Sequence, residues 1–228
     1  MYTKKNHKKK LIPSATVIIV CDSDKGLQVL MLRRSLQLKF GSGYWVFPGG
    51  KINKMDYNAG INNIHVAARI AAIRESKEEA GLVLNENKLI FTSHWTSPQE
   101  MKTRFSTWYY VTEINENVDI CIDNSEIIQY QWYKPSDALL DFNDKKIKIM
   151  APTFVTLSEL SNCKSVVEAL AMYRRNPTYY TPKTIKLKNG FCSLYKGDSG
   201  YQKCDQNIKG KHHRLLLLNE QWHYIKDI

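Results

Sequence analysis

The sequence lacks any apolar run that approaches the roughly 18 residues of a membrane-spanning helix. The lysine-rich start MYTKKNHKKK precedes the apolar stretch LIPSATVIIVC, an order that superficially resembles a secretory signal. Pro13 interrupts that stretch, however, and no small-residue cleavage site follows it. We therefore predict a basic tail at residues 1–12 followed by a strand, and we expect no membrane partner.

Cysteine is scarce and shows no pairing pattern. Five cysteines are scattered along the chain, and no two of them form a CxxC pair. This spacing is typical neither of a zinc knuckle nor of a dense disulfide framework. Reduced thiols are the default for such a chain, so we expect a cytoplasmic protein.

Acidic residues are outnumbered by basic ones. The chain has 22 Asp and Glu residues against 33 Lys and Arg residues, which gives a formal net charge of +11. A surplus of this size favours anionic partners, namely nucleic acid, phosphorylated metabolites or an acidic surface, without choosing among them. Hydrophobic residues at 43% and charged residues at 24% of the 228 residues are ordinary for a globular protein. Global disorder is therefore not expected.

Strand and helix patterns follow one another along the chain. The β-rich runs 14–21 and 27–32 flank a DSDKG turn and predict a hairpin, and residues 64–79 have the composition of a helix that ends at Gly81. Further strands are predicted at 44–52, 88–98, 104–114 and 127–135, and helices at 135–142 and 151–176. We predict an α/β domain at 13–176, with helices on the faces of a sheet, and a C-terminal extension of unknown role at 177–228.

The stretch RESKEEAGL, residues 74–82, gathers carboxylates near the C-terminal end of the predicted helix, where the helix dipole is already negative. Residues three and four apart share a helix face, so Glu75, Glu78 and Glu79 can converge on one side. Carboxylates held so close would raise one another's pKa unless a cation lay between them. Mg²⁺ and Mn²⁺ prefer carboxylate and water oxygens, so the pattern favours a site for such an ion. A solvated acidic face without a bound ion is the alternative.

RESKEEAGL resembles the second half of the Nudix box, GX5EX7REUXEEXGU, in which U is a bulky apolar residue. VFPGG at 46–50 is similar to the strand and glycine turn that open the box. The matching box positions are Arg74, Glu75, Glu78, Glu79, Gly81 and Leu82. The resemblance implies the Nudix fold, a mixed β-sheet sandwiched between α-helices.

The sequence departs from the box at two positions. Ser76 stands where an apolar residue is usual, and Val66 stands where the first glutamate of the box falls by count. The glycine turn also lies about ten residues too far upstream, which implies an insertion across KMDYNAGINN. The glutamate that normally steadies Arg74 is therefore missing, or Asp56 in the insertion replaces it.

An insertion at this point resembles the branch of the superfamily that includes coenzyme A diphosphatases and their bacterial relatives. The resemblance covers roughly residues 14–160. The segments that carry it are LRRSLQLKFGSGYWVFPGG, HWTSPQEMKTRFSTWYYV, SEIIQYQWYKPSDALL and APTFVTLSEL.

The resemblance implies a metal-dependent hydrolase of a pyrophosphate bond, with coenzyme A or acyl-coenzyme A as the expected substrate. It implies that Glu75, Glu78 and Glu79 bind Mg²⁺ or Mn²⁺ and that Arg74 assists them. Glu126 is the best candidate for a general base outside the box. The substrate-binding candidates are the backbone at Gly49 and Gly50 and the side chains of Arg33, Arg34 and Arg104.

Two other functions stay open. A Nudix pyrophosphatase could act on a nucleotide sugar, a dinucleoside polyphosphate or capped RNA, and the net charge of +11 permits RNA without requiring it. A non-catalytic Nudix module could bind a nucleotide or RNA in the same cleft. The three retained carboxylates favour the enzyme.

Overall fold

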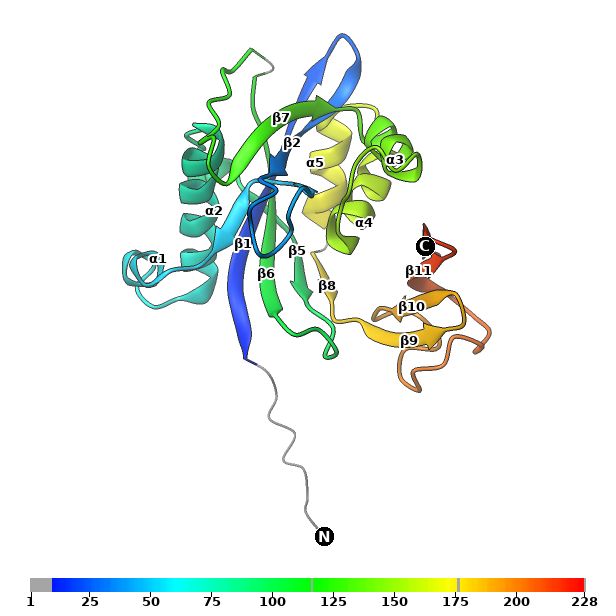
Figure 1. Ribbon diagram of the computed structural model, residues 1–228. Coiled ribbons are helices and arrows are strands. Elements are labelled where there is room, and N and C mark those ends of the chain that lie inside the picture. The colour runs from blue at the N-terminus through cyan, green and yellow to red at the C-terminus, as the bar shows by residue number, and fades with distance from the viewer. Residues whose placement is uncertain (1–9, 116, 176, 228) are drawn as a thin grey trace.

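The computed structural model describes residues 10–115, 117–175 and 177–227 (Figure 1). Most of the predicted basic tail, residues 1–9, lies outside the described residues. The strands are β1 (Leu11–Ser23), β2 (Gly26–Arg34), β3 (Trp45–Val46), β4 (Gly49–Lys51), β5 (Ile90–Thr96), β6 (Arg104–Glu113), β7 (Ile127–Tyr133), β8 (Thr178–Tyr180), β9 (Lys183–Leu187), β10 (Gly190–Leu194), β11 (His213–Leu218) and β12 (Gln221–Lys226). The helices are α1 (Lys54–Ala59), α2 (Ile64–Ala80), α3 (Pro135–Asn143), α4 (Ala151–Leu160) and α5 (Val166–Arg175), with a short 3₁₀ helix at Glu86–Lys88.

Within the described residues, eight strands form the main sheet in the order β3-β2-β1-β6-β5-β8, with β4 also paired to β1 and β7 to β2. The sheet is mixed, because β1 runs antiparallel to β2 but parallel to β6, and β8 runs parallel to β5. Helix α2 covers one face, whereas α3, α4 and α5 lie on the other (Figure 1). The predicted architecture of a mixed sheet between helices is confirmed.

The continuous apolar run of β1 places this strand at the centre of the sheet. Val17 and Ile19 pack on the α2 side, and Ile18 and Val20 pack on the opposite side. A strand that is buried on both faces needs an unbroken apolar run instead of an alternating one. The sequence VIIV therefore fixes β1 between the two helical layers.

Helix α2 approaches the sheet closely because its inner face is built from alanine. It begins after Asn63, whose side-chain oxygen caps the first turn, and it ends at Gly81, whose φ of 71° lies in the left-handed region that favours glycine. The predicted helix and its end at Gly81 are confirmed. Its buried alanines are Ala67, Ala68, Ala71, Ala72 and Ala80.

The chain after α5 first completes the main sheet and then forms a second sheet. Strand β8 pairs with β5 beyond the predicted domain end at residue 176, so the main sheet includes part of the predicted extension. Tyr180 in β8 stacks on Trp95 in β5, with ring centroids 3.8 Å apart. Strands β9 to β12 form an antiparallel sheet of their own (Figure 1). The segment predicted as mainly helical at 151–176 contains two helices, α4 and α5, separated by a turn.

A polar cluster joins the second sheet to α4. One carboxylate oxygen of Glu159 accepts hydrogen bonds from the hydroxyls of Tyr180 and Tyr224 at 3.2 and 3.4 Å, and from Nζ of Lys226 at 2.8 Å. Leu215 of β11 also lies in the apolar cluster that contains Tyr180. The C-terminal extension therefore shares the core of the main domain.

The described part of the chain contains neither disulfide bonds nor a helix that could span a membrane. None of the five cysteines, all of which lie in the described part of the chain, forms a disulfide. Over the same described ranges, no helix combines the length and the apolarity that a membrane crossing requires.

Candidate active site

Arg74 lies at the centre of a carboxylate network near the C-terminal end of α2. Its Nη1 donates to Oε1 of Glu75 and to Oε2 of Glu78, each at 2.8 Å. Its Nε and Nη2 donate to the two carboxylate oxygens of Asp56 at 3.0 and 2.9 Å, and Nη2 also donates to the Lys51 carbonyl at 3.0 Å. The hydrogen bonds to Asp56 are the main reason that the pKa of Arg74 lies above its usual range. The guanidinium is therefore held in place from both sides.

Asp56 comes from α1, inside the predicted insertion, and it is only 2% exposed. It forms a capping box with Asn53, in which each side chain accepts a hydrogen bond from the other residue's backbone N–H, at 2.8 and 3.0 Å. Val66, at the position of the missing box glutamate, is 39% exposed. The structure thus brings Asp56, and not residue 66, to Arg74.

Glu79 is a nearly buried carboxylate beneath the glycine turn. It is 5% exposed, and its Oε2 accepts a hydrogen bond from the Gly49 N–H at 2.9 Å. Burial raises the pKa of Glu79 to about 8, the Gly49 N–H opposes this shift, and the nearby Glu75 carboxylate adds to it. Glu75 and Glu79 are therefore close enough to repel each other when both are ionised.

Gly50 provides the space that Glu75 occupies. A Cβ atom at Gly50 would lie 2.5–2.6 Å from the carboxyl carbon and both oxygens of Glu75. Burial raises the pKa of Glu75, and the contact with Arg74 lowers it. The glycine turn and the end of α2 therefore form one site, as the resemblance to the Nudix box implies.

A second group of charges comes from the end of β2 and the residues before β7. Nη2 of Arg34 lies 3.7 Å from Oε2 of Glu126. Arg34 lowers the pKa of Glu79 and Glu126 raises it, so both act on the same buried carboxylate. Arg33 instead donates across the sheet to Oε1 of Gln129 at 3.4 Å. Within the described residues, Nε of each of these two arginines is buried without a hydrogen-bond partner.

Arg104 contacts the connection between β5 and β6. Its Nε donates to the carbonyls of Ser97 and Pro98 at 3.3 and 3.1 Å, and its Nη2 donates to the Ser97 carbonyl at 3.1 Å. These contacts supply the partners that a half-buried arginine in a strand requires. A substrate contact for Arg104 stays a prediction.

Comparison with known proteins agrees with this geometry. The NUDIX domain family matches residues 10–153. The chain belongs to the Nudix family. A relative from Caenorhabditis elegans that carries the name nudix hydrolase 7 is 25% identical over 231 residues. The match covers 85% of this chain and 75% of that protein. The acyl-coenzyme A diphosphatase NUDT19 of Xenopus laevis is 23% identical over 290 residues, which cover 85% of this chain and 76% of that protein.

A solved structure shows the same fold. The NUDIX hydrolase from Alicyclobacillus acidocaldarius aligns with a TM-score of 0.67 at 18% identity, covering 74% of this chain and 99% of that one. Family and relatives together support a Nudix pyrophosphohydrolase, as the sequence predicts. At this identity, the structural likeness speaks for the fold alone.

Nudix hydrolases generally use divalent metal ions, and the candidate ligands for such an ion are the carboxylates of Glu75, Glu78 and Glu79. Among the residues that the structure describes, no three acidic, histidine or cysteine side chains form a ready-made metal cluster. Arg74 binds an oxygen of Glu75 and an oxygen of Glu78. Glu75 and Glu79, one helical turn apart, nevertheless fit a hard cation, which would relieve their mutual repulsion. Glu78, with a side chain 57% exposed, faces Arg74, and its role as a ligand stays a prediction.

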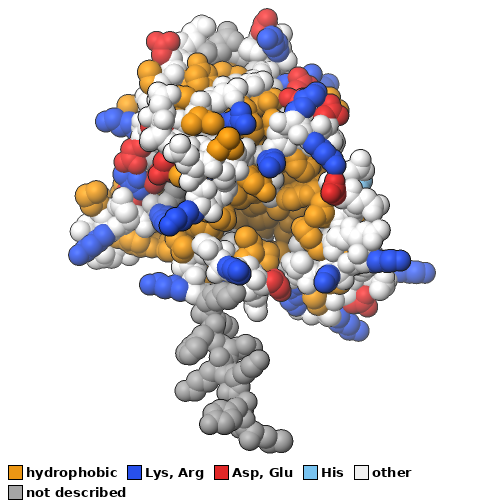
Figure 2. Space-filling view, viewed as in Figure 1, with side chains coloured by type: hydrophobic (Ala, Val, Ile, Leu, Met, Phe, Trp, Pro, Cys, Tyr) orange, Lys and Arg blue, Asp and Glu red, His pale blue; other side chains and the backbone are white. Residues whose placement is uncertain are grey.

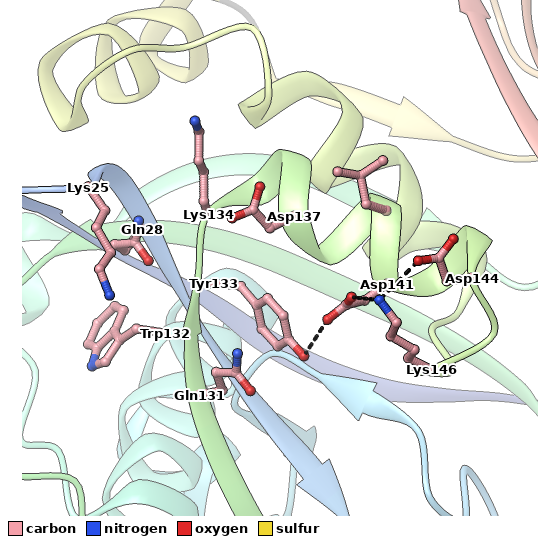
Figure 3. Close-up of a pocket in the computed structure, with 11 residues that line it drawn as sticks. Lys25, Gln28, Gln131, Trp132, Tyr133, Lys134, Asp137, Asp141, Asp144 and Lys146 are labelled. Carbon is pink, nitrogen blue, oxygen red and sulfur yellow. Dashed lines mark hydrogen bonds and ion pairs between the residues drawn. The ribbon is translucent and has the colours of Figure 1, made fainter.

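Sequence reasoning did not indicate the pocket shown in Figure 3. It encloses about 540 Å³ between β7 and α3 and contains none of the predicted Nudix site residues. Lys146 pairs there with Asp141 at 3.2 Å and with Asp144 at 2.9 Å, and the Tyr133 hydroxyl donates to Asp141 at 3.4 Å. The pocket is therefore lined by charged side chains but lies apart from the Nudix site residues.

Proposed function

We propose that this Nudix hydrolase cleaves the pyrophosphate bond of coenzyme A or acyl-coenzyme A with Mg²⁺ or Mn²⁺. The products would be adenosine 3′,5′-bisphosphate and (acyl-)phosphopantetheine. The observation that carries the reaction is the position of Glu75 and Glu79 directly beneath the Gly49–Gly50 turn. The name of the Xenopus laevis relative, an acyl-coenzyme A diphosphatase, supports the choice of substrate.

The chain's own groups would bind and orient the pyrophosphate. A bound divalent ion supplies charge neutralisation and a more acidic water. The Gly49 N–H already serves Glu79, so the glycine turn contributes chiefly close backbone approach. Arg34 supplies a guanidinium beside the carboxylates, suited to a phosphate oxygen. Glu126, whose side chain is 59% exposed opposite Arg34, is the proposed general base that accepts the proton of the attacking water.

An apolar surface next to Arg34 supports a substrate with a hydrophobic part. The loop between β2 and β3 carries Leu36 and Phe40, which are 67% and 41% exposed. The Phe40 ring contacts Phe105 of β6, with centroids 5.2 Å apart. Figure 2 shows a hollow with hydrophobic side chains on the face of the molecule that it presents. Pantetheine or an acyl chain would bury part of that surface.

The test is a substrate panel with Mg²⁺ or Mn²⁺, made up of coenzyme A, acetyl-coenzyme A, a long-chain acyl-coenzyme A, NADH, ADP-ribose, a diadenosine polyphosphate and capped RNA. We expect the highest kcat/KM for a coenzyme A substrate, with release of adenosine 3′,5′-bisphosphate measured by chromatography. Glu79→Gln keeps an oxygen for the Gly49 N–H but removes the charge, and it should reduce turnover at least about 100-fold. Glu86→Gln, at an exposed residue of the 3₁₀ helix, should leave turnover unchanged.

The alternatives give different results in the same panel. Preference for another member would keep the Nudix chemistry and replace the substrate. No turnover of any member, together with metal-independent ligand binding that survives Glu79→Gln, would identify a binding module instead.

A further inference from the structure

The insertion between the glycine turn and α2 contains a residue that is aimed at the active site. The position that the Nudix box reserves for its first glutamate holds Val66, an apolar and partly exposed residue. Arg74 therefore has no acidic partner at the expected place in the sequence. The structure supplies one from α1, because Asp56 binds Nε and Nη2 of Arg74 with both carboxylate oxygens.

We infer that Asp56 is a positioning residue for hydrolysis, which acts through Arg74 on Glu75 and Glu78. The inference rests on the proposed function for its reaction, but its geometry is independent of the substrate. A guanidinium that is held by two parallel hydrogen bonds has a fixed plane. In that plane, the remaining Nη1 of Arg74 reaches Glu75 and Glu78 at 2.8 Å each. Asp56 thereby fixes the orientation of the guanidinium that contacts these two carboxylates.

The insertion is built to hold Asp56 firmly. The capping box with Asn53 fixes the start of α1, and the turn between α1 and α2 is tight. A Cβ atom at Gly60 would lie 2.8 Å from the backbone nitrogen of Ala67, so this turn requires glycine to approach α2. Ile61 and Asn62 follow with positive φ angles of 51° and 57°; asparagine adopts this conformation readily, but a β-branched residue such as Ile61 rarely does. The strained turn places α1 beside the end of α2 that carries Arg74.

The first experiment compares Asp56→Asn and Asp56→Glu with the wild type, on the best substrate of the panel. Asp56→Asn should lower kcat about 10- to 100-fold with little change in KM, as expected for a residue that orients groups at a metal site. Asp56→Glu keeps the charge and the acidic third position of the capping box, so it should recover most of that loss. Unchanged kcat in Asp56→Asn, or equal kcat in both variants, would overturn the inference.

A matched control separates positioning from general stability. Asp198 is also a buried aspartate with an arginine partner, since Nε and Nη2 of Arg214 donate to its two oxygens at 2.6 and 2.8 Å. It lies in the connection between β10 and β11, outside the Nudix box. Asp198→Asn should lower the melting temperature and leave kcat of the folded protein unchanged. A similar fall of kcat in Asp198→Asn would show that loss of stability explains both variants.

A second readout does not depend on turnover. Mn²⁺ binding to the folded protein, measured by titration calorimetry, should weaken about 10- to 100-fold in Asp56→Asn and stay near the wild-type value in Asp56→Glu. If the wild type hydrolyses no substrate of the panel, the proposed function fails, and this titration still tests the role of Asp56. Mn²⁺ affinity that is equal in the wild type and in Asp56→Asn would overturn that role.

Discussion

At the residue scale, the two adjacent glycines of β4 meet different requirements. Gly49 has a φ of 156°, and a Cβ atom there would strike the backbone of β1, including the Thr16 Cα at 2.7 Å. The three atoms nearest to a Cβ atom at Gly50 all belong to the flexible end of Glu75. The first glycine is therefore required by the fold, and the second by the site.

This difference predicts opposite results for two alanine variants. Gly49→Ala should lower the free energy of unfolding by about 1–3 kcal/mol, because its Cβ meets rigid backbone in a strained conformation. Gly50→Ala should change the melting temperature little but lower kcat about 10-fold or more, because it displaces the Glu75 carboxylate. Thermal unfolding and steady-state kinetics on both variants check the prediction. A Gly50→Ala protein with full activity would show that Glu75 does not need its observed position.

Glu79 gives the site a pH dependence that can be measured without substrate. Its pKa is about 8 in the folded chain, because it is buried, and near 4.5 when the chain unfolds. The folded protein therefore holds a proton that the unfolded chain releases between these values. The stability due to this proton is fully present below about pH 4.5 and is lost as the pH rises through about 8.

The corresponding prediction concerns the metal-free protein in a chelating buffer. Between pH 5 and pH 9, the wild type should lose unfolding free energy relative to Glu79→Gln, by up to about 1.4 kcal/mol for each unit of pKa shift. Denaturant titrations of both proteins at several pH values measure the difference. Two curves that run parallel over this range would contradict a buried, protonated Glu79.

Some residues of the candidate site could be predicted from the sequence, and others could not. Glu75, Glu79, Gly49 and Gly50 could be found because their spacing is fixed by one helix and one turn. Asp56 could only be offered as a candidate, because its contact with Arg74 depends on the path of the insertion. The Lys51 carbonyl that also binds Arg74 carries no side-chain signal at all.

At the scale of elements, β8 links the main sheet to the second sheet. It pairs Thr178 to Tyr180 with Ser93 to Trp95, and it places Tyr180 against both Trp95 and Tyr195. Without these residues, β5 would become the edge of the sheet and Trp95 would lose its stacked partner. The pairing partner of β8 could not be predicted, because parallel pairing between distant segments leaves no local pattern.

Truncation tests this link. A chain that ends after Arg175 should be poorly soluble or should melt well below the full chain, because it exposes apolar surface around Trp95 and an unpaired strand edge. A chain that ends after Thr181 keeps β8 and should be more stable than the shorter one. Light scattering and thermal unfolding compare the three proteins. Equal melting temperatures for all of them would show that the extension folds separately.

At the scale of the whole molecule, the sequence predicted the α/β class and most elements, because their apolar periods and caps are local. The predicted domain end at residue 176 excludes β8, although β8 belongs to the main sheet. Strand β8 follows α4 and α5 in the chain and pairs with β5, which precedes both helices. The second sheet packs on α4 through Glu159, a contact between residues that lie more than sixty positions apart. Such contacts depend on tertiary packing and leave little trace in composition.

The parallel pairing of β1 with β6 has a consequence for synthesis on the ribosome. Leu11 lies opposite Arg104 and Val20 opposite Glu113, so the central strand is made long before its neighbour. Until residue 113 emerges, the apolar stretch Val17 to Val20 lacks one of the partners that shield it in the finished sheet. A nascent chain in this state is prone to aggregate. This hydrolase should therefore depend on chaperones during translation more than a protein whose strands pair in sequence order.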